Sequence, residues 1–167
     1  MKKMYPISIL FTKYEDLFSR GVYYLTGRKY THVSINIDEN DKNTYYSFNK
    51  RGFKIENIEK YKAKIKSSIL YTIYLTKEKY EKLKEIIERF KKNKAQFKYN
   101  LFGVLLCVLG IPYKFDKRYF CSQFVAEILK ESESVKLKSR ACLYHPNKLE
   151  REFRQVFHFD NVLINSI

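Results

Sequence analysis

The chain of 167 residues has no tryptophan, only five glycines and three prolines, and no internal repeat or low-complexity tract. So little glycine and proline is unlike a linker-rich or repeat-built protein. Hydrophobic residues make up 45% and aromatic residues 17%, which argues against intrinsic disorder. A chain of this length can bury a substantial core, and we expect a single domain over residues 1–167.

Cysteine is also scarce, with three residues: Cys107, Cys121 and Cys142. An odd number without close pairs does not form a disulfide framework and suits a reducing compartment. The paired Cys or His spacings of zinc sites and the glycine-rich loop of phosphate sites are missing as well. We therefore expect no metal and no cofactor.

Long hydrophobic runs are missing too. The apolar run at residues 7–11 is too short for a secretory signal, and no small-residue cleavage site follows it. The most apolar run, residues 101–111, is shorter than the roughly 20 residues that cross a bilayer. We expect it to be a buried helix, with an element in a membrane interface as the alternative. We predict a cytoplasmic protein.

Acidic residues are outnumbered, at 18 against 33 lysines and arginines, which gives a net charge of +15. The excess is concentrated at residues 49–66, where four lysines alternate with other residues: Lys60, Lys62, Lys64 and Lys66. On a strand, these would form a row on one face. Such a row attracts an anionic lipid or acidic polymer, with nucleic acid less favoured. The alternative is a solvated edge strand that its lysines protect from aggregation.

Hydropathy patterns predict an α+β fold, with a mostly antiparallel sheet packed against helices. Strands are predicted at 5–12, 31–38, 44–49, 68–75 and 155–164, and helices at 16–25, 77–94, 100–109, 121–129 and 145–153. A polar turn joins the second and third strands into a hairpin. In the second strand, Val33 and Ile35 face the core, while His32 and Ser34 lie on the face we expect to be exposed.

The segment FCSQFVAEIL, residues 120–129, has apolar residues three, four, seven and eight positions after Cys121. This is the buried stripe of an amphipathic helix with the thiol at its N-terminus. The unpaired N–H groups and partial positive charge of a helix N-terminus favour the nucleophilic thiolate. The sequence therefore predicts a reactive thiol at Cys121, with a small buried core residue as the alternative.

A thiol nucleophile needs a base, and the chain has three histidines: His32, His145 and His158. We favour His32, because a strand holds its ring rigidly among small polar neighbours. The base in turn needs an orienting partner, which the other strand of the hairpin can supply. Ser47 is favoured for this role, and Asn49 is the alternative.

Three segments then resemble a known family: THVSI at 31–35, YSF at 46–48 and the cysteine segment at 120–129. They are similar to the permuted NlpC-type cysteine hydrolases, the YiiX/YebB-like group, over about residues 5–159. The resemblance implies a papain-like core in which the histidine strand precedes the cysteine helix. It implies Cys121 as nucleophile, His32 as base and a polar third residue. Members often have His, Glu, Asn or Gln in that role, so Ser47 departs from the pattern.

Two classes of function follow. The first is a cysteine hydrolase or acyltransferase acting on an amide or ester bond of a peptide, wall-fragment or lipid acyl substrate. Cys121 would form an acyl-enzyme, with its backbone N–H as one oxyanion donor, and water or another nucleophile would accept the acyl group. The second is a non-catalytic module that binds nucleic acid or anionic lipid through a basic surface.

Overall fold

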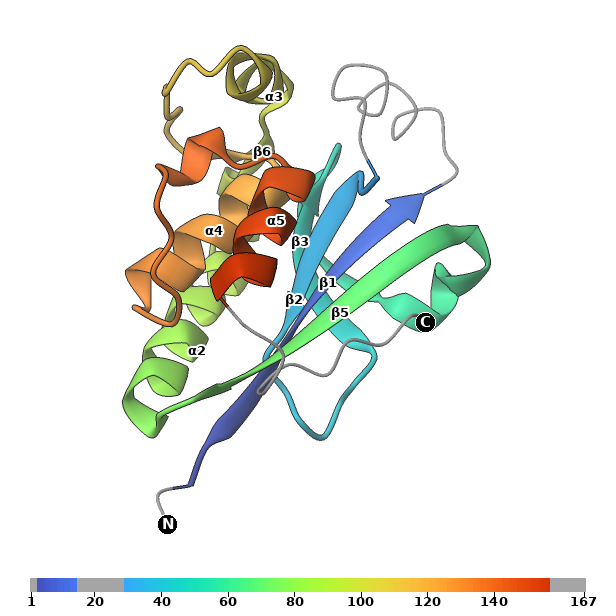
Figure 1. The fold of residues 1–167 in the computed structure, drawn as a ribbon, viewed down its shortest axis with the longest axis vertical. Helices are drawn as coiled ribbons and strands as arrows, with labels where there is room; N and C mark the ends of the chain where they lie inside the picture. The colour runs from blue at the N-terminus through green and yellow to red at the C-terminus, as the bar shows by residue number, and fades with distance from the viewer. Residues whose placement is uncertain (1–2, 15–28, 157–167) are drawn as a thin grey trace.

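A computed structural model describes residues 3–14 and 29–156 of the chain. One antiparallel sheet has the strand order β4-β3-β2-β1-β5 (Figure 1). Its strands are β1 (Tyr5–Tyr14), β2 (His32–Asn36), β3 (Thr44–Asn49), β4 (Gly52–Asn57) and β5 (Ile65–Leu75). The predicted hairpin is present as the antiparallel pair β2–β3.

Helices cover one face of this sheet (Figure 1). They are α2 (Lys77–Lys92), α4 (Cys121–Glu131) and α5 (Pro146–Val156), while α3 (Leu101–Val108) lies at one end of the molecule. Two short parallel strands, β6 (Lys98–Tyr99) and β7 (Arg118–Tyr119), flank α3 in sequence. Short 3₁₀ helices complete the described fold: η1 (Ile58–Lys60), η2 (Lys62–Lys64), η3 (Lys94–Gln96) and η4 (Ala141–Leu143). The predicted α+β class is confirmed.

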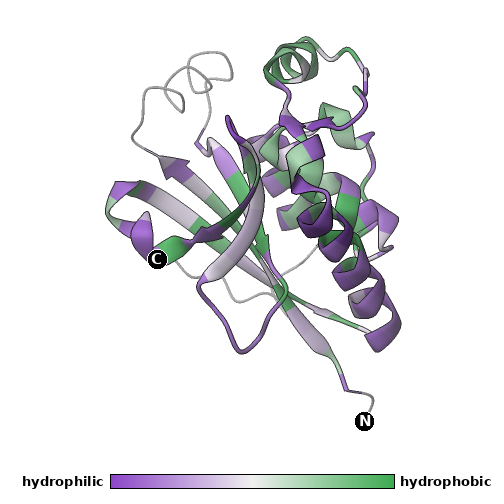
Figure 2. Ribbon diagram, turned by 180° about the vertical axis from the view of Figure 1, so that it is seen from behind, coloured by the Kyte–Doolittle hydropathy of each residue, from purple (hydrophilic) through white to green (hydrophobic). Residues whose placement is uncertain are grey.

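The main hydrophobic core lies between the sheet and the helices. The predicted stripe of the cysteine helix is fully buried in it: Phe124, Val125, Ile128 and Leu129. It packs with Val33 and Ile35 of β2, and the outward faces of α2, α4 and α5 are largely hydrophilic (Figure 2). Burial of this stripe fixes α4, and with it the position of Cys121.

The second face of β2 is also buried, which corrects the expected exposed face. All five residues of β2 are buried, because β2 is the central strand and a smaller cluster covers the other side of the sheet. That cluster consists of Leu10, Tyr45 and Ile58, with Ile65 and Leu70 packed against it. His32 is therefore a buried histidine, 8% exposed.

Strand β4 is not among the predicted strands, because a glycine such as Gly52 weakens a strand pattern. Gly52 is instead the first residue of β4, opposite Asn49 across a two-residue turn. Asn49 Oδ1 accepts from Arg51 N at 2.9 Å, and Gly52 has φ +91°, a conformation that glycine adopts without strain. A Cβ at this position would collide with the carbonyl oxygen of Phe97.

The predicted lysine row on a strand is wrong. Residues 58–60 and 62–64 form η1 and η2, and β5 begins only at Ile65. The Asn57 side chain caps η1 by accepting from Glu59 N at 3.1 Å, which ends the extended backbone. The four lysines are exposed, but they do not share one face of a strand.

At the C-terminal end, α5 continues through Val156, so residues 155 and 156 are helical and not the start of the predicted strand. The rest of that strand, the predicted helix 16–25 and His158 lie outside the described residues. No helix in the described segments is long and apolar enough to cross a membrane.

The helix predicted at 100–109 forms as α3, but it is not the buried helix expected: only Gly103, Val104 and Cys107 are buried.

Candidate active site

Cys121 is the first residue of α4 and is 5% exposed. The preceding residue, Phe120, has extended backbone angles of φ −109° and ψ 164°, and its carbonyl accepts from Phe124 N at 3.0 Å. At this position the N–H of Cys121 precedes the repeating helical hydrogen bonds. The thiol and unpaired first-turn N–H groups therefore occupy the same end of α4.

His32 is the first residue of β2 and is held from two sides. Asn147 of α5 bonds both backbone groups of Tyr30, accepting from its N–H at 3.0 Å and donating to its carbonyl at 2.7 Å. Tyr14 N donates to Thr31 Oγ1 at 3.3 Å, and the Tyr14 ring lies 5.4 Å from the His32 ring, centroid to centroid. These contacts fix the chain that leads into His32 and place the Tyr14 ring beside its imidazole.

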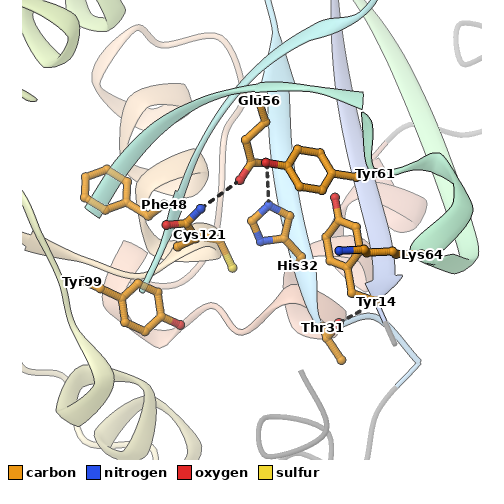
Figure 3. Close-up of a pocket in the computed structure, with 10 residues that line it drawn as sticks. Tyr14, Thr31, His32, Phe48, Glu56, Tyr61, Lys64, Tyr99 and Cys121 are labelled. Carbon is orange, nitrogen blue, oxygen red and sulfur yellow. Dashed lines mark hydrogen bonds and ion pairs between the residues drawn. The ribbon is translucent and has the colours of Figure 1, made fainter. Parts of the chain in front are cut away.

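Glu56 of β4 is the carboxylate partner of His32. Its Oε2 lies 3.1 Å from His32 Nε2, and its Oε1 accepts from Asn49 Nδ2 at 3.5 Å (Figure 3). Because Nε2 faces Glu56, Nδ1 is the ring nitrogen on the side of Cys121 (Figure 3). The Cys121 side chain lies on that side, close enough to the imidazole to contribute to its raised pKa. Asn49, Glu56, His32 and Cys121 thus form a continuous polar chain.

The electrostatics of this chain favour charged partners. Burial alone would lower the pKa of His32, but the Glu56 charge and hydrogen bonds to Cys121 and Glu56 raise it well above its ordinary value. Burial would raise the pKa of Glu56, but attraction to His32 outweighs it and the pKa is lowered. Each partner therefore stabilises the charged form of the other, and their side chains are each 11% exposed.

A cavity of about 170 Å³ opens onto these groups. His32, Glu56 and Cys121 line it together with Tyr14, Thr31, Phe48, Asn49, Tyr61, Lys64 and Tyr99 (Figure 3). Tyr99 pairs in register with Tyr119, two residues before Cys121. Burial, together with a Coulombic interaction with Cys121, raises the pKa of Tyr99 well above its ordinary value. Tyr99 and His32 flank the sulfur from opposite sides (Figure 3).

Comparison with known proteins identifies a solved structure with a similar fold. No protein-family model matches the chain, and no curated protein matches it significantly. Among solved structures, the crystal structure of metalloprotein YiiX from Escherichia coli O157:H7 matches 99% of this chain and 88% of its own, with a TM-score of 0.51 and 15% identity. The chain has a YiiX-like fold.

The description of YiiX as a metalloprotein does not extend to the residues found here. In the segments that the structure describes, no group of three or more His, Cys, Asp or Glu side chains could hold a metal ion. The side chains of Glu56 and Cys121, which could serve as metal ligands, instead both interact with the His32 ring. We therefore assign no role to a metal ion at this site.

The structure brings Cys121 and His32 together, but it does not bring Ser47 to the imidazole. Ser47 is fully buried, and its hydroxyl donates to the carbonyl oxygen of Val33 at 2.6 Å, which joins β3 to β2. Glu56 occupies the position beside the ring instead. The alternative, Asn49, does line the cavity, but its side chain donates to Glu56, and Glu56 in turn contacts His32.

The other described histidine has a different setting. His145 directly precedes α5, and its Nδ1 accepts from Lys148 N at 3.0 Å, as a side chain that caps a helix does. It borders a second, smaller cavity that also reaches Cys121. The Nδ1 atom of His145 is thus engaged by the backbone at the start of α5.

Sequence reasoning missed Glu56 and Tyr99. A signal for Glu56 was present, since Phe53, Lys54, Ile55 and Glu56 alternate apolar and polar residues as a strand does. This signal is weak, because Gly52 lies at its start and a glycine disfavours a strand. Tyr99 has no comparable local signal, because its place in the YiiX-like fold depends on the pairing of β6 with β7.

Proposed function

We propose that the chain is a cysteine hydrolase or acyltransferase with Cys121 as nucleophile, His32 as acid–base and Glu56 as orienting carboxylate. The observation that carries the proposal is the buried His32 ring, which contacts Glu56 through Nε2 and Cys121 on its other side, at the wall of a cavity. The order of histidine strand before cysteine helix fits the permuted papain-like arrangement of the NlpC-type hydrolases that the sequence resembles.

In the first half-reaction, His32 Nδ1 holds the proton released by the Cys121 thiol, and Sγ attacks the carbonyl carbon of an amide or ester. A C–S bond forms as the carbonyl π electrons move to oxygen. The C–N or C–O bond then breaks, and the leaving group takes the proton from His32. The product of this step is a thioester on Cys121.

In the second half-reaction, the neutral His32 accepts a proton from water or another acceptor, which attacks the thioester carbon. The C–S bond breaks, Cys121 leaves as thiolate, and the pair with the imidazolium is restored. Water gives a carboxylic acid, as in a hydrolase, and an alcohol or amine gives acyl transfer.

The oxyanion requires donors aimed at the position that it will occupy. The backbone N–H of Cys121, at the first position of α4, is one. The second proposed oxyanion donor is the hydroxyl of Tyr99. The Tyr99 side chain lies on the side of the sulfur opposite His32 (Figure 3). Its raised pKa keeps this phenol protonated, and so able to donate, across the neutral range.

The test compares two cysteines in one chain. Hydrolysis of a panel of chromogenic esters and peptide amides is measured with the unaltered chain, Cys121→Ala and Cys142→Ala. Cys142 is the matched control because it is buried to a similar extent, at 7% exposed, but borders a different cavity. We expect turnover and a thioester on Cys121, detected by mass spectrometry, in the unaltered chain and the control.

Cys121→Ala should lose both signals while its thermal unfolding curve stays cooperative. Equal turnover of every accepted substrate by the Cys121 and Cys142 variants would remove the proposed function. Turnover that survives in Cys121→Ala without a thioester would assign the activity to a different group.

A further inference from the structure

The outer face of α3 is an unusual surface for this chain. Large apolar side chains are exposed along the helix and the segment that follows, with Leu101 at 57%, Phe102 at 58% and Leu109 at 62%. Leu105, Ile111 and Tyr113 extend the same surface. The ribbon of α3 is almost uniformly hydrophobic (Figure 2), whereas the other helices present hydrophilic residues outward. We call these six side chains the α3 surface.

Cations border the α3 surface. Residues 100–113 contain no charged side chain, and the flanking positions carry four cations and one acid: Lys98, Lys114, Lys117, Arg118 and Asp116. Lys98 and Arg118 are in-register partners of β6 and β7, and both are exposed. They thus place two positive charges side by side where α3 begins.

The inner face of α3 contacts the candidate active site. Val104 and Cys107 pack with Phe120, the residue before Cys121, and with Tyr99. The same two residues line the smaller cavity that reaches Cys121. One helix therefore has its inner side on the thiol-bearing segment and its outer side exposed as an apolar surface.

We propose that the α3 surface docks on an anionic lipid bilayer. A bilayer accepts apolar side chains without requiring complementary shape or hydrogen bonds, which suits a helix at the end of the molecule (Figure 1) with no charged group on its outer face. The bordering Lys98, Lys117 and Arg118 are placed to contact phosphate head groups, and each such contact strengthens binding to a negative surface. Charge complementarity favours a lipid surface that is anionic over one that is neutral.

Docking in this orientation brings the thiol-bearing end of α4 close to the bilayer. The proposal does not depend on catalysis, since the α3 surface and its cations would bind lipid even if Cys121 were inert. Its failure and the failure of the proposed function are therefore observed separately: binding is measured without any substrate.

The first experiment uses the absence of tryptophan from the chain. Phe102→Trp introduces a single indole on the α3 surface, and Tyr74→Trp introduces one at a comparably exposed site on β5, 48% exposed. Vesicles of phosphatidylcholine with phosphatidylglycerol should shift the emission of Phe102→Trp to shorter wavelength and leave that of Tyr74→Trp unchanged. An equal response of the two reporters, or none from Phe102→Trp, would overturn the proposal.

The second experiment measures co-sedimentation with the same vesicles. Phe102→Ser/Leu109→Ser should lower the partition coefficient on the order of tenfold, because two exposed apolar side chains are removed from the interface. Tyr74→Ser is the control and should bind like the unaltered chain. Lys98→Ser/Arg118→Ser should weaken binding to anionic vesicles and flatten its dependence on salt.

Two further outcomes would contradict a lipid occupant. Equal binding to pure phosphatidylcholine vesicles would remove the role of the anionic surface. A concentration-dependent dimer in size-exclusion chromatography that Phe102→Ser/Leu109→Ser abolishes, without vesicle binding by the unaltered chain, would assign the α3 surface to a second copy. Circular dichroism melting curves check each variant for folding, and the tryptophan pair gives a result even if the double serine variant unfolds.

Discussion

Carboxylates are buried in two regions of the molecule, with different partners. Beside the cavity, Glu56 faces the imidazole of His32. Beneath α5, Glu150 accepts from the hydroxyl of Tyr71 at 2.7 Å and from Arg154 Nη2 at 2.7 Å. Glu152, also on α5, accepts from the hydroxyl of Tyr144 at 2.6 Å.

The partners decide what each carboxylate can do. Tyrosine hydroxyls keep their protons at neutral pH, and burial together with the neighbouring carboxylates raises the pKa of Tyr71 and Tyr144 further. The α5 carboxylates therefore join a helix to the structure around it without exchanging protons. Glu56 instead holds a group that can exchange a proton, next to a thiol and an open cavity. Burial of a charge is common to both regions, but only one has the groups for chemistry.

The largest expected effect comes from replacing the imidazole. His32→Gln should reduce kcat/KM on the order of 10³-fold, because it removes the imidazole that takes and returns the proton in the proposed mechanism. Chromogenic ester hydrolysis measures this, with circular dichroism to confirm folding. A variant that retains activity within a few-fold of the original would show that the Glu56 region does no more than the α5 region.

Glu56→Gln should lower kcat/KM by about 100-fold and change its pH dependence. Glu56 raises the pKa of His32, so its loss lowers that pKa, and the alkaline limb of the profile should move to lower pH. An alkaline limb that stays in place would contradict the orienting role of Glu56.

The same pair predicts a pH window of stability. A lowered pKa for Glu56 gives stability that is lost as pH falls through its folded value, and a raised pKa for His32 gives stability that is lost as pH rises through its folded value. The stability difference between the original chain and Glu56→Gln should therefore be largest between those two limits. Urea unfolding across the pH range measures it.

Glu150→Ala should act on stability instead of turnover. It leaves the Tyr71 hydroxyl buried without its acceptor, so the free energy of unfolding should fall by about 2 kcal/mol. The pH profile of any hydrolysis should keep its shape, since the residue does not line the cavity of His32. Urea denaturation and a pH–rate profile on the same sample test both parts. A shifted alkaline limb would contradict the prediction, because it would show that Glu150 affects the ionisation of the cavity groups.

The smallest effect is expected for Ser47→Ala. Its hydroxyl bonds the Val33 carbonyl between two strands, so we expect a loss of about 1 kcal/mol in unfolding free energy. Turnover should stay at the original level. A large loss of kcat with unchanged stability would restore Ser47 to the role first expected from the sequence.

How far the sequence predicts this structure depends on the distance over which each contact acts. The stripe after Cys121 and the alternation around His32 repeat within a few residues, so the α4 helix and the β2 strand could be identified from periodicity. The contact between His32 and Glu56 spans 24 positions and crosses β3, so it follows from the order of strands in the sheet. No local pattern contains that order.

The errors have similar physical causes. Alternation of Lys60, Lys62 and Lys64 fits a strand, but a side-chain cap from Asn57 and two short 3₁₀ turns replace it. The apolar run at 101–111 predicts a helix correctly, but periodicity cannot tell burial from exposure when nearly every residue is apolar. Ser47 does not reach the imidazole, because its hydroxyl donates to the Val33 carbonyl within the sheet.

Gly52 has a consequence for the cavity as a whole. Its α-carbon lies against the backbone of Phe97, two residues before Tyr99, and it starts the strand that carries Glu56. A residue without a side chain thus lets β4 approach the segment that leads to Tyr99. A methyl group there would force β4 away from Phe97, and we expect this to change the spacing between Glu56 and Tyr99. The spacing of the proposed catalytic groups therefore depends on a residue outside the proposed site.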